Sequence, residues 1–414
     1  MKETYILEFK ENITKSFLKT VSAFSNYEGG TIIFGIDDDG NIKGIDNAYK
    51  KCLDIENRIN DNITPQPNYQ LKVDDNNTII LTVDPGDNKP YFYNSKAYKR
   101  NDTSTIEVDS FELTRLVLEG KKINYEDLPS NNQNLNFDYL EYKLKKVIHI
   151  DTFNTDTLKT LNLFNNNLFN NAANLLSNNN SFPGIDIAVF GKNINIIKKR
   201  FILENMSILE IYDKSIQAYI DYYQYEEIDG SYRKKVELIP EEAFRESVAN
   251  ALIHRAWDLN SKIRISMFED RIEISSPGGL VNGITRDEYL SGMISSLRNP
   301  IISNVFFRLG IVEIFGTGIL RIINSYKQSI KKPIFNTSTN TIQIILPVFN
   351  SNSSLKEDEN MIYQILKQNG SLSIGQIIPL VPYGRSKAKQ IIKKMVKDNV
   401  IKISGKGRGT KYYI

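Results

Sequence analysis

Ser386-Lys-Ala-Lys-Gln-Ile-Ile-Lys-Lys-Met-Val-Lys397 is the stretch that decides the fold of the last part of this chain. Its apolar residues recur at helical spacing, and Ser386 is a suitable N-cap. These apolar residues are Ala388, Ile391, Ile392 and Met395. Two further helices are predicted before it, over 357–367 and 374–380, and two short strands after it, over 401–403 and 411–414. Helix, helix, turn, helix and hairpin is the order of a winged helix, which we expect over residues 355–414.

Basic residues are concentrated in this C-terminal module. They occupy the other faces of the 386–397 helix and the turn Gly405-Lys-Gly-Arg-Gly409. Lysine and arginine neutralise DNA phosphates, and a glycine-rich wing can approach a DNA backbone closely. The residues that we expect to contact nucleic acid are Lys387, Lys389, Lys393, Lys394, Lys406 and Arg408. The alternative is a solvated lysine face or a module that contacts protein.

The composition is that of an ordinary folded protein with several domains. A chain of 414 residues exceeds what one hydrophobic core supports, so about three domains of mixed α/β structure are expected. The single cysteine, Cys52, excludes an intrachain disulfide and a cysteine-based zinc site, which fits the reducing cytoplasm. The N-terminus lacks a signal-peptide pattern, and no apolar run approaches ~18 residues, so no membrane association is predicted. A homo-oligomer is compatible with the sequence.

A pattern with chemical meaning lies in Phe244-Arg-Glu-Ser-Val-Ala-Asn-Ala-Leu-Ile-His254. A helix is predicted over 241–257, and the four-residue spacing places Glu246 and Asn250 on one face, with His254 one turn further on. A carboxylate can orient water, and an amide oxygen can coordinate Mg²⁺, which prefers oxygen ligands. The alternative is that these side chains are surface, capping or structural hydrogen-bonding groups.

Three further blocks follow this helix. They are Phe268-Glu-Asp-Arg-Ile-Glu-Ile-Ser-Ser-Pro-Gly-Gly279, Arg298-Asn-Pro300 and Glu313-Ile-Phe-Gly-Thr-Gly-Ile319. With the helix motif, and over residues 236–349, they resemble the GHKL-type ATPase domain of a family of transcriptional regulators. The resemblance implies a Bergerat-like α/β sandwich that binds ATP and Mg²⁺, with Glu246 as the catalytic carboxylate and Asn250 at the metal. It places His254, Gly278, Gly316 and Gly318 around the nucleotide.

One departure from the GHKL pattern concerns the base of the nucleotide. GHKL ATPases normally hold an adenine-reading Asp where this chain has Ser275-Ser-Pro-Gly278. The resemblance therefore leaves ATP selectivity open, and it implies at most a weak ATPase.

The N-terminal part carries blocks of a different kind. They are Glu3-Thr-Tyr-Ile-Leu-Glu-Phe-Lys10, Ala23-Phe-Ser-Asn26, Gly29-Gly30, Gly35-Ile-Asp-Asp38, Pro90-Tyr91 and Tyr98-Lys-Arg100. A helix around Phe17–Phe24 and strands at 31–36, 78–83 and 96–100 are predicted among them. Residues 1–115 thereby resemble the Schlafen AlbA-like domain, which in bacterial proteins is described as DNA-binding. The resemblance implies nucleic-acid binding here, and Lys10 and Arg100 are candidates for phosphate contact.

An alternative function follows from the same resemblance. Some Schlafen proteins cleave RNA with three acidic residues, and matching by position places these acids at Glu3, Glu8 and Asp38. Such carboxylates, with Glu8 and Asp38 as metal ligands, could hold a divalent cation that activates water. The protein would then be a metal-dependent RNA or tRNA endonuclease, in stress or phage defence.

The segment 116–235 has the weakest pattern and is predicted to be a mixed α/β connector. Its Asn-rich stretch, 165–180, is either a surface loop or a run of polar helix ends. Our preferred hypothesis is a cytoplasmic DNA-binding transcriptional regulator. In it, the middle domain binds ATP and biases how the end domains engage DNA, with RNA as an alternative partner of the N-terminal domain.

Overall fold

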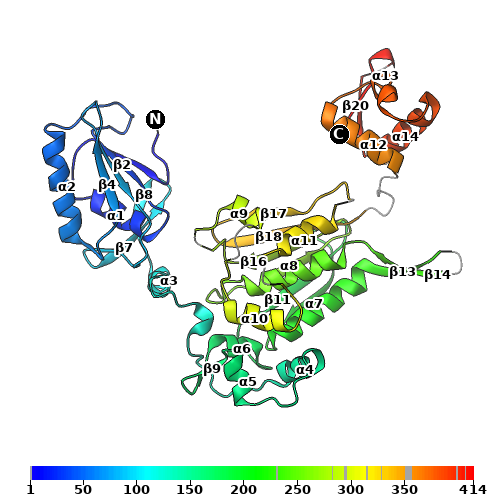
Figure 1. Ribbon diagram of the computed structural model, residues 1–414, viewed down its shortest axis with the longest axis horizontal. Helices are drawn as coiled ribbons and strands as arrows, with labels where there is room; N and C mark the ends of the chain where they lie inside the picture. Colours follow the sequence, from blue (N-terminus) through cyan, green and yellow to red (C-terminus); the bar gives the residue numbers. More distant parts are fainter. Residues whose placement is uncertain are drawn as a thin grey trace. The chain divides into compact units, whose positions relative to one another are not determined.

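The computed structural model describes residues 2–229, 232–281, 283–292, 296–313, 316–327, 329–349, 357–397, 400–405 and 407–414. The chain forms two compact units, Met1–Leu128 and Pro129–Ile414 (Figure 1). Both units combine helices with β-sheets. The mixed α/β, multidomain class predicted from the sequence is therefore confirmed.

The first unit contains two four-stranded sheets. One has the order β1-β2-β5-β4, in which β1 and β2 are parallel and the other neighbours are antiparallel. Its strands are β1 (Leu7–Lys10), β2 (Gly30–Phe34), β5 (Ile79–Val83) and β4 (Tyr69–Val73). The second sheet, β3-β6-β7-β8, comprises Ile63–Thr64, Phe92–Tyr93, Lys96–Asn101 and Ser104–Glu107. The helices are α1 (Phe17–Asn26), α2 (Ala48–Asn62), α3 (Ser110–Gly120) and the 3₁₀ turn η1 (Tyr125–Asp127).

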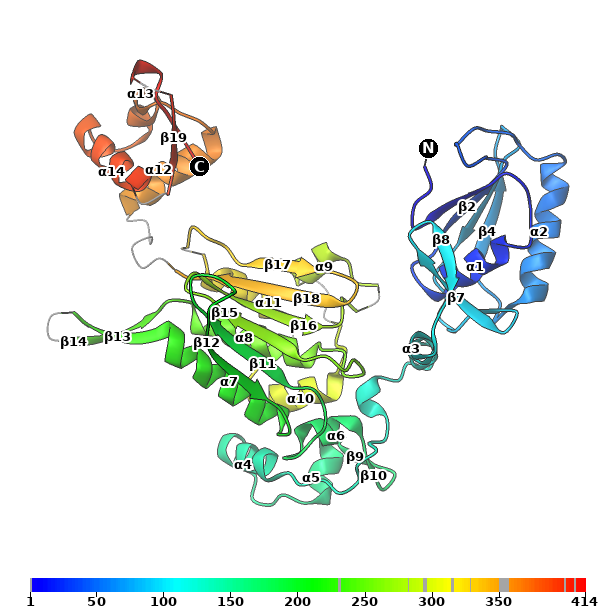
Figure 2. The same cartoon turned by 180° about the vertical axis from the view of Figure 1, so that it is seen from behind.

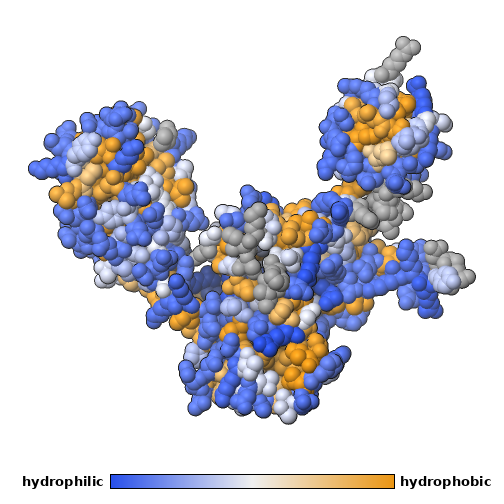
Figure 3. Space-filling view, in the orientation of Figure 1, coloured by the Kyte–Doolittle hydropathy of each residue, from blue (hydrophilic) through white to orange (hydrophobic). Residues whose placement is uncertain are grey.

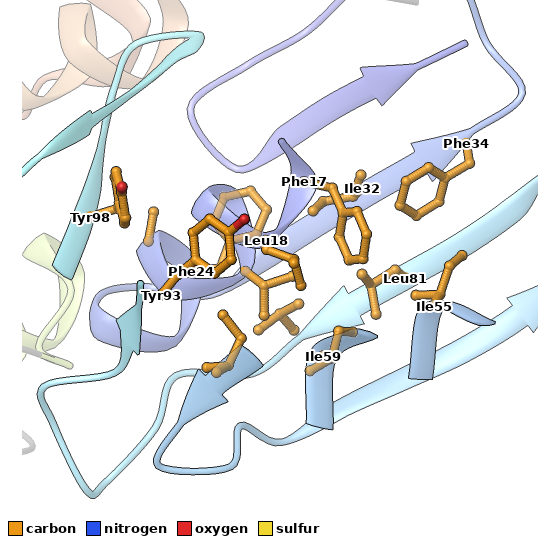
Figure 4. Close-up of a cluster of buried hydrophobic side chains, with 14 of the residues drawn as sticks. Phe17, Leu18, Phe24, Ile32, Phe34, Ile55, Ile59, Leu81, Tyr93 and Tyr98 are labelled. Atoms are coloured by element: carbon orange, nitrogen blue, oxygen red, sulfur yellow. The ribbon is translucent and has the colours of Figure 1, made fainter. Parts of the chain in front are cut away.

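Helix α1 fills the core of this unit (Figure 4). Phe17 packs edge-on against Phe34 of β2, with ring centroids 5.3 Å apart. A Cβ at Gly30 would lie 2.5 Å from the ring of Phe24, so only glycine fits where β2 passes α1. The helix predicted around these phenylalanines is confirmed. Helix α2 was not predicted, because only Ala48, Ile55 and Ile59 of its 15 residues are buried.

A six-stranded sheet is the centre of the second unit. Its order is β12-β11-β15-β16-β18-β17; β11 and β15 are parallel, and all other neighbours are antiparallel. The strands are β12 (Ile197–Leu203), β11 (Ile185–Phe190), β15 (Ile263–Met267), β16 (Arg271–Pro277), β18 (Thr341–Pro347) and β17 (Ile334–Thr337). The strands predicted at 262–268, 271–275 and 341–348 are thereby confirmed with small changes in their ends.

Helices cover one face of this sheet (Figures 1 and 2). They are α7 (Ile208–Tyr223), α8 (Glu241–Ile253), α10 (Pro300–Arg308) and α11 (Gly318–Ser325), with the short α9 (Arg286–Ser291) nearby. Ile185, Ile187 and Val189 alternate with less buried residues along β11, as expected for a sheet with one covered face. Helix α8 packs between α7, α11 and the strands β16 and β18. Its side chains can therefore reach the space between the helices and the sheet.

The Asn-rich stretch is part of a folded segment, and several of its asparagines are buried. The segment comprises α4 (Asp138–Val147), α5 (Thr155–Thr160), β9 (Phe164–Asn165), β10 (Leu168–Phe169) and α6 (Asn171–Leu176). Asn174 Nδ2 donates to Ser130 Oγ at 3.0 Å, and Asn170 caps α6. The first part of the stretch, residues 165–168, is an exposed hairpin turn, whereas residues 170–177 are buried and their asparagines bond to backbone and side-chain groups.

Hairpin β13 (Gln224–Asp229) and β14 (Tyr232–Glu237) extends from the second unit beyond α7. Its visible face is mostly hydrophilic (Figure 3). Acidic residues of β13 lie opposite basic residues of β14, as Glu226 lies opposite Lys235. Such cross-strand pairs help to fix the hairpin register.

The C-terminal residues form a small core of their own. They comprise α12 (Glu357–Asn369), α13 (Ile374–Ile377), η2 (Ile378–Leu380), α14 (Arg385–Lys397), β19 (Lys402–Ser404), η3 (Gly407–Gly409) and β20 (Lys411–Tyr413). Ile362, Leu366, Ile377, Ile392 and Met395 pack together inside. The predicted helices and strands of this region are thus present. Among all described helices, none is long and apolar enough to cross a membrane.

Candidate functional site

Helix α8 brings Glu246 and Asn250 to the start of α11. The two side chains are one turn apart on α8, and Gly318 is the first residue of α11. A Cβ at Gly318 would lie 2.1 Å from Oε1 of Glu246 and 3.1 Å from Nδ2 of Asn250. A side chain at position 318 would therefore displace the Glu246 carboxylate or the Asn250 amide, and glycine keeps both in place beside the start of α11.

A cleft opens at this point, lined by residues of α8, α11 and the segment that follows β16. Its space, counted together with the part open to solvent, is about 850 Å³. Its lining includes Glu246, Asn250, His254, Tyr289, Glu313, Gly316, Gly318, Ile319 and Ile342. The structure thus brings together five of the residues that the sequence suggested around a nucleotide. The sixth, Gly278, lies just before lining residue Gly279.

Burial perturbs the pKa of Glu246 and that of His254, two of the titratable groups that line the cleft. Burial raises the pKa of Glu246, while Arg321 acts in the opposite direction. A carboxylate of raised pKa is a better proton acceptor once ionised. Burial lowers the pKa of His254 to about 4, and the guanidinium of Arg298 adds to this effect. The imidazole is therefore neutral at pH 7.

The position of His254 differs from the prediction, because α8 ends at Ile253 and not at Trp257. His254 is the C-cap residue, so it does not continue the helical face of Glu246 and Asn250. Side chains outside α8 donate hydrogen bonds to its last carbonyl oxygens. Asn299 Nδ2 donates to Ile253 O at 2.6 Å, and Ser276 Oγ donates to Ala251 O at 2.8 Å. These bonds satisfy carbonyls at the end of the helix, and His254, the next residue, lines the cleft.

Arg298 and Asn299 are structural parts of the site that the sequence motif Arg298-Asn-Pro300 did not explain. Arg298 Nη2 donates to Gly279 O at 2.9 Å. At Gly278, which has a φ of 105°, a Cβ would lie 2.0 Å from Arg298 Nη1. Arg298 thereby fixes the segment after β16 as one wall of the cleft, and Gly278 serves this packing.

The acids of the first unit do not form a cluster. Glu8 is buried; its Oε2 accepts from Thr20 Oγ1 at 2.8 Å and pairs with Arg100, and its Oε1 pairs with Lys10 Nζ at 2.7 Å. Glu3 Oε1 instead accepts from Phe9 N at 2.7 Å, and Asp38 is exposed in the turn after β2. Among the described residues, no three His, Cys, Asp or Glu side chains are grouped to hold one cation. Glu3, Glu8 and Asp38, which the sequence suggested as catalytic acids with Glu8 and Asp38 at the metal, are thus not gathered into one group among the described residues.

Arg100 is also not available for the expected contact with phosphate. Its side chain is only 3% exposed, and Nη1 donates to Thr105 Oγ1 at 2.8 Å as well as pairing with Glu8. Lys10 is partly exposed but is engaged by the same carboxylate. Both residues neutralise Glu8, a role that sequence spacing could not reveal, since 92 residues separate Arg100 from Glu8.

The lysines of α14 divide into two groups. Lys387 Nζ pairs with Asp358 at 2.6 Å and Lys394 Nζ with Glu359 at 2.7 Å, so both tie α14 to α12. Lys389 and Lys393 are exposed. Lys406 lies outside the described residues, and Arg408 lies in η3.

Family models match two parts of the chain. Residues 3–109 match the model described as Schlafen, AlbA_2, and residues 260–346 match the model described as "Putative ATP-dependent DNA helicase recG C-terminal". The chain carries a Schlafen AlbA_2 domain and an ATPase-like domain. The resemblances predicted for these two regions are thereby confirmed, and the two domain types are those of a nucleic-acid-related, ATP-binding protein. The ATPase-like match contains Gly278, Gly316 and Gly318, and α8 precedes it.

Among solved structures, the chain is similar to the DIP2311 protein from Corynebacterium diphtheriae. The two sequences are 18% identical, the TM-score is 0.50, and the match covers 99% of this chain and 92% of that chain. This likeness concerns the fold alone. No curated protein matches the chain.

Proposed function

We propose that this protein is a DNA-binding regulator that holds Mg²⁺ and ATP in the cleft between α8 and α11. The observation that carries the proposal is the meeting of Glu246 and Asn250 with the glycine-flanked start of α11. Bound nucleotide would change the affinity of the protein for DNA, which is how such a protein could regulate transcription.

The cleft residues have the chemistry that a magnesium nucleotide requires. The amide oxygen of Asn250 and the carboxylate of Glu246 are oxygen donors of the type that Mg²⁺ takes. Gly316, with a φ of 68°, precedes α11 and Gly318 begins it, so that free backbone N–H groups of the first turn can face phosphate oxygens. When bound, Mg²⁺ supplies charge that offsets the phosphates.

Within this arrangement, Glu246 is the group placed to accept a proton from water. Its raised pKa follows from burial, and its carboxylate lies beside Asn250 and Gly318. Any hydrolysis would therefore depend on Glu246, whereas nucleotide binding would depend more on Asn250 and on the glycines.

The C-terminal module supports the DNA-binding part of the proposal. Its helices and its hairpin follow the order of a winged helix, and α14 presents a basic surface beside a separate apolar core. Phosphate neutralisation by such a surface makes affinity depend on salt.

The proposal is tested by titrating the full chain with a non-hydrolysable ATP analogue and Mg²⁺ in a calorimeter. We expect saturable binding that Asn250→Ala weakens at least tenfold. The matched control is Asn336→Ala on β17, whose side chain is exposed and bonds to Gln343 away from the cleft lining. A wild-type chain that binds no analogue, or equal effects of the two substitutions, would contradict the nucleotide site.

A further inference from the structure

The hairpin of β13 and β14 exposes both of its faces along residues 225–228 and 232–235. Its base is fixed to the start of α8, where Gln224 Nε2 and Lys235 Nζ bond to Glu241 Oε2 at 2.8 and 2.7 Å. Beyond this base the hairpin extends away from the sheet and its helices (Figures 1 and 2). A two-stranded hairpin without further packing is only marginally stable in water, so a partner that covers one face would stabilise it.

One face of the hairpin carries ion pairs that are complete within one chain. Directly opposed residues of an antiparallel pair point to the same side, and the register here places Glu226 opposite Lys235 and Ile228 opposite Arg233. Arg233 Nη1 lies 3.3 Å from Glu226 Oε2. Lys235 Nζ lies 3.4 Å from Glu237 Oε1. The charges of this face are therefore balanced without a partner.

The other face combines aromatic and apolar side chains with two unused charges. The register places Tyr225 opposite Val236 and Glu227 opposite Lys234, and Tyr232 lies on the same side nearer the tip. Tyr225 is 45% exposed and Tyr232 is 81% exposed. Within the described part of the chain, Glu227 and Lys234 enter no ion pair. This face can therefore give a partner both apolar contact and charge.

The charges of the hairpin are segregated by strand. The acids of β13 and the bases of β14 are Glu226, Glu227 and Asp229, and Arg233, Lys234 and Lys235. Glu237 brings the total to four acids against three bases, so the hairpin lacks the excess of positive charge with which a β-ribbon neutralises DNA phosphates. The matching partner presents an acidic strand beside a basic strand, as a second copy of this hairpin does.

Two copies of the hairpin match each other about a twofold axis that runs along the strands. When the two faces are stacked about this axis, β13 of each copy lies over β14 of the other. Glu227 then lies over Lys234 of the second copy, and symmetry forms the same pair a second time. Tyr225 lies over Val236 of the second copy in the same way. Stacked sheets lie about 10 Å apart, a spacing that side chains of this length fill from both sides.

We propose that the face formed by Tyr225, Glu227, Tyr232, Lys234 and Val236 is the contact surface of a homodimer. The two strands have six residues each, so the face measures roughly 20 by 10 Å. Standard interfaces bury about 800 Å² on each partner, and smaller ones are weak, so the dimer dissociates at about micromolar concentrations. The proposal is independent of the nucleotide site.

The test is sedimentation velocity of the full chain between about 1 and about 100 µM, without nucleotide or DNA. The wild type is expected to shift from monomer to dimer across this range. Glu227→Lys, and separately Lys234→Glu, should raise the dissociation constant at least tenfold, because like charges then meet in both pairs between the copies. A wild type that stays monomeric throughout overturns the proposal.

The matched control is Glu226→Lys, which also places two like charges opposite each other within one hairpin, but on the other face. Its dissociation constant is expected to stay within about threefold of the wild type, since this face lies outside the contact. Equal weakening by Glu226→Lys and Glu227→Lys overturns the assignment of the contact face.

An equimolar mixture of the Glu227→Lys and Lys234→Glu chains separates a contact between copies from damage to the hairpin. Each variant alone keeps like charges opposite each other in its own hairpin, in the mixture as well. The mixed dimer, however, places the two basic positions of one copy over the two acidic positions of the other. The mixture is therefore expected to dimerise at least tenfold more tightly than either variant alone. A mixture that associates no better than its components overturns the proposal.

Discussion

Charge balance around Glu8 is the main buried electrostatic feature of the first unit. Glu8 and Arg100 are almost completely shielded from solvent, and Lys10 shares the same carboxylate. Removing one partner of a buried ion pair leaves the other charge uncompensated, which costs far more than the pair itself contributes.

Glu8→Gln should therefore destabilise the first unit by roughly 3 kcal/mol, since it leaves the Arg100 guanidinium buried without a counterion. Urea denaturation of the full chain, followed by circular dichroism, measures this change. The control is Glu107→Gln, whose partner Lys96 is about half exposed; its effect should be below about 1 kcal/mol. Similar losses for both variants would argue against a stabilising role of the buried pair.

His254 makes the stability of the second unit depend on pH. Its pKa of about 4 lies below the ordinary 6.5, so the unfolded chain binds the proton first as the pH falls. The stability of the native state is complete above about pH 6.5 and is lost toward pH 4. The loss reaches up to about 3 kcal/mol, because a tenfold difference in proton affinity is worth about 1.4 kcal/mol.

The measurement compares the free energy of unfolding at pH 7.5 and pH 5.0 for the wild type and for His254→Asn. Other groups titrate equally in both proteins, so the variant should lose less stability on acidification. Parallel losses would show that His254 is as easily protonated in the folded as in the unfolded chain.

At the level of single residues, a contact could be predicted from the sequence where both partners lie on the same helix. Glu246 and Asn250 share a face of α8 because four residues separate them. The pairing of Glu8 with Arg100 depends on packing between β1 and β7, and no local period encodes it. For the same reason, the capping of α8 by Asn299 and Ser276 could not be predicted.

Helix α14 presents its basic residues in two rows with different surroundings. Arg385, Lys389, Lys393 and Lys397 are four residues apart and exposed, and they extend over about 18 Å of helix. Lys387 and Lys394 instead pair with acids of α12. The first row is therefore better placed to approach phosphates, whereas Lys387 and Lys394, although about half exposed themselves, are held by acids of α12.

The double substitution Lys389→Ala and Lys393→Ala should weaken DNA binding and reduce the slope of log affinity against log salt by about 2, since each phosphate contact contributes about 1. Fluorescence anisotropy with a labelled duplex at several salt concentrations measures both quantities. The matched control is Lys387→Ala with Lys394→Ala, which should change the salt slope by less than half as much. Equal slopes in the two variants would remove the distinction between the rows.

Helices and strands could be predicted where the apolar periodicity was strong. The prediction failed where tertiary packing determines whether an element forms and where it ends. The C-terminal helices and strands β15, β16 and β18 follow directly from their patterns. Helix α2 escaped prediction because its few buried residues are diluted by polar ones. The predicted helix extended to Trp257, beyond the end of α8 at Ile253. Ala256 and Trp257 are buried although they lie outside the helix, so their apolar character did not indicate a helical turn.

Coupling between nucleotide and DNA is the property of the whole molecule that the proposed function requires. A ligand shifts an equilibrium only by its differential affinity for two states, and the coupling is reciprocal. If Mg²⁺ and ATP change the affinity for a DNA duplex by a given factor, which we expect to be at least fivefold, the duplex must change the affinity for ATP by the same factor.

Anisotropy with labelled DNA, with and without saturating ATP analogue, measures the effect of nucleotide on DNA affinity. Calorimetry with and without saturating DNA measures the effect of DNA on nucleotide affinity. Asn250→Ala should abolish the effect of nucleotide on DNA while leaving DNA affinity without nucleotide unchanged. Equal DNA affinity at zero and saturating nucleotide would mean that the cleft and the C-terminal module act independently.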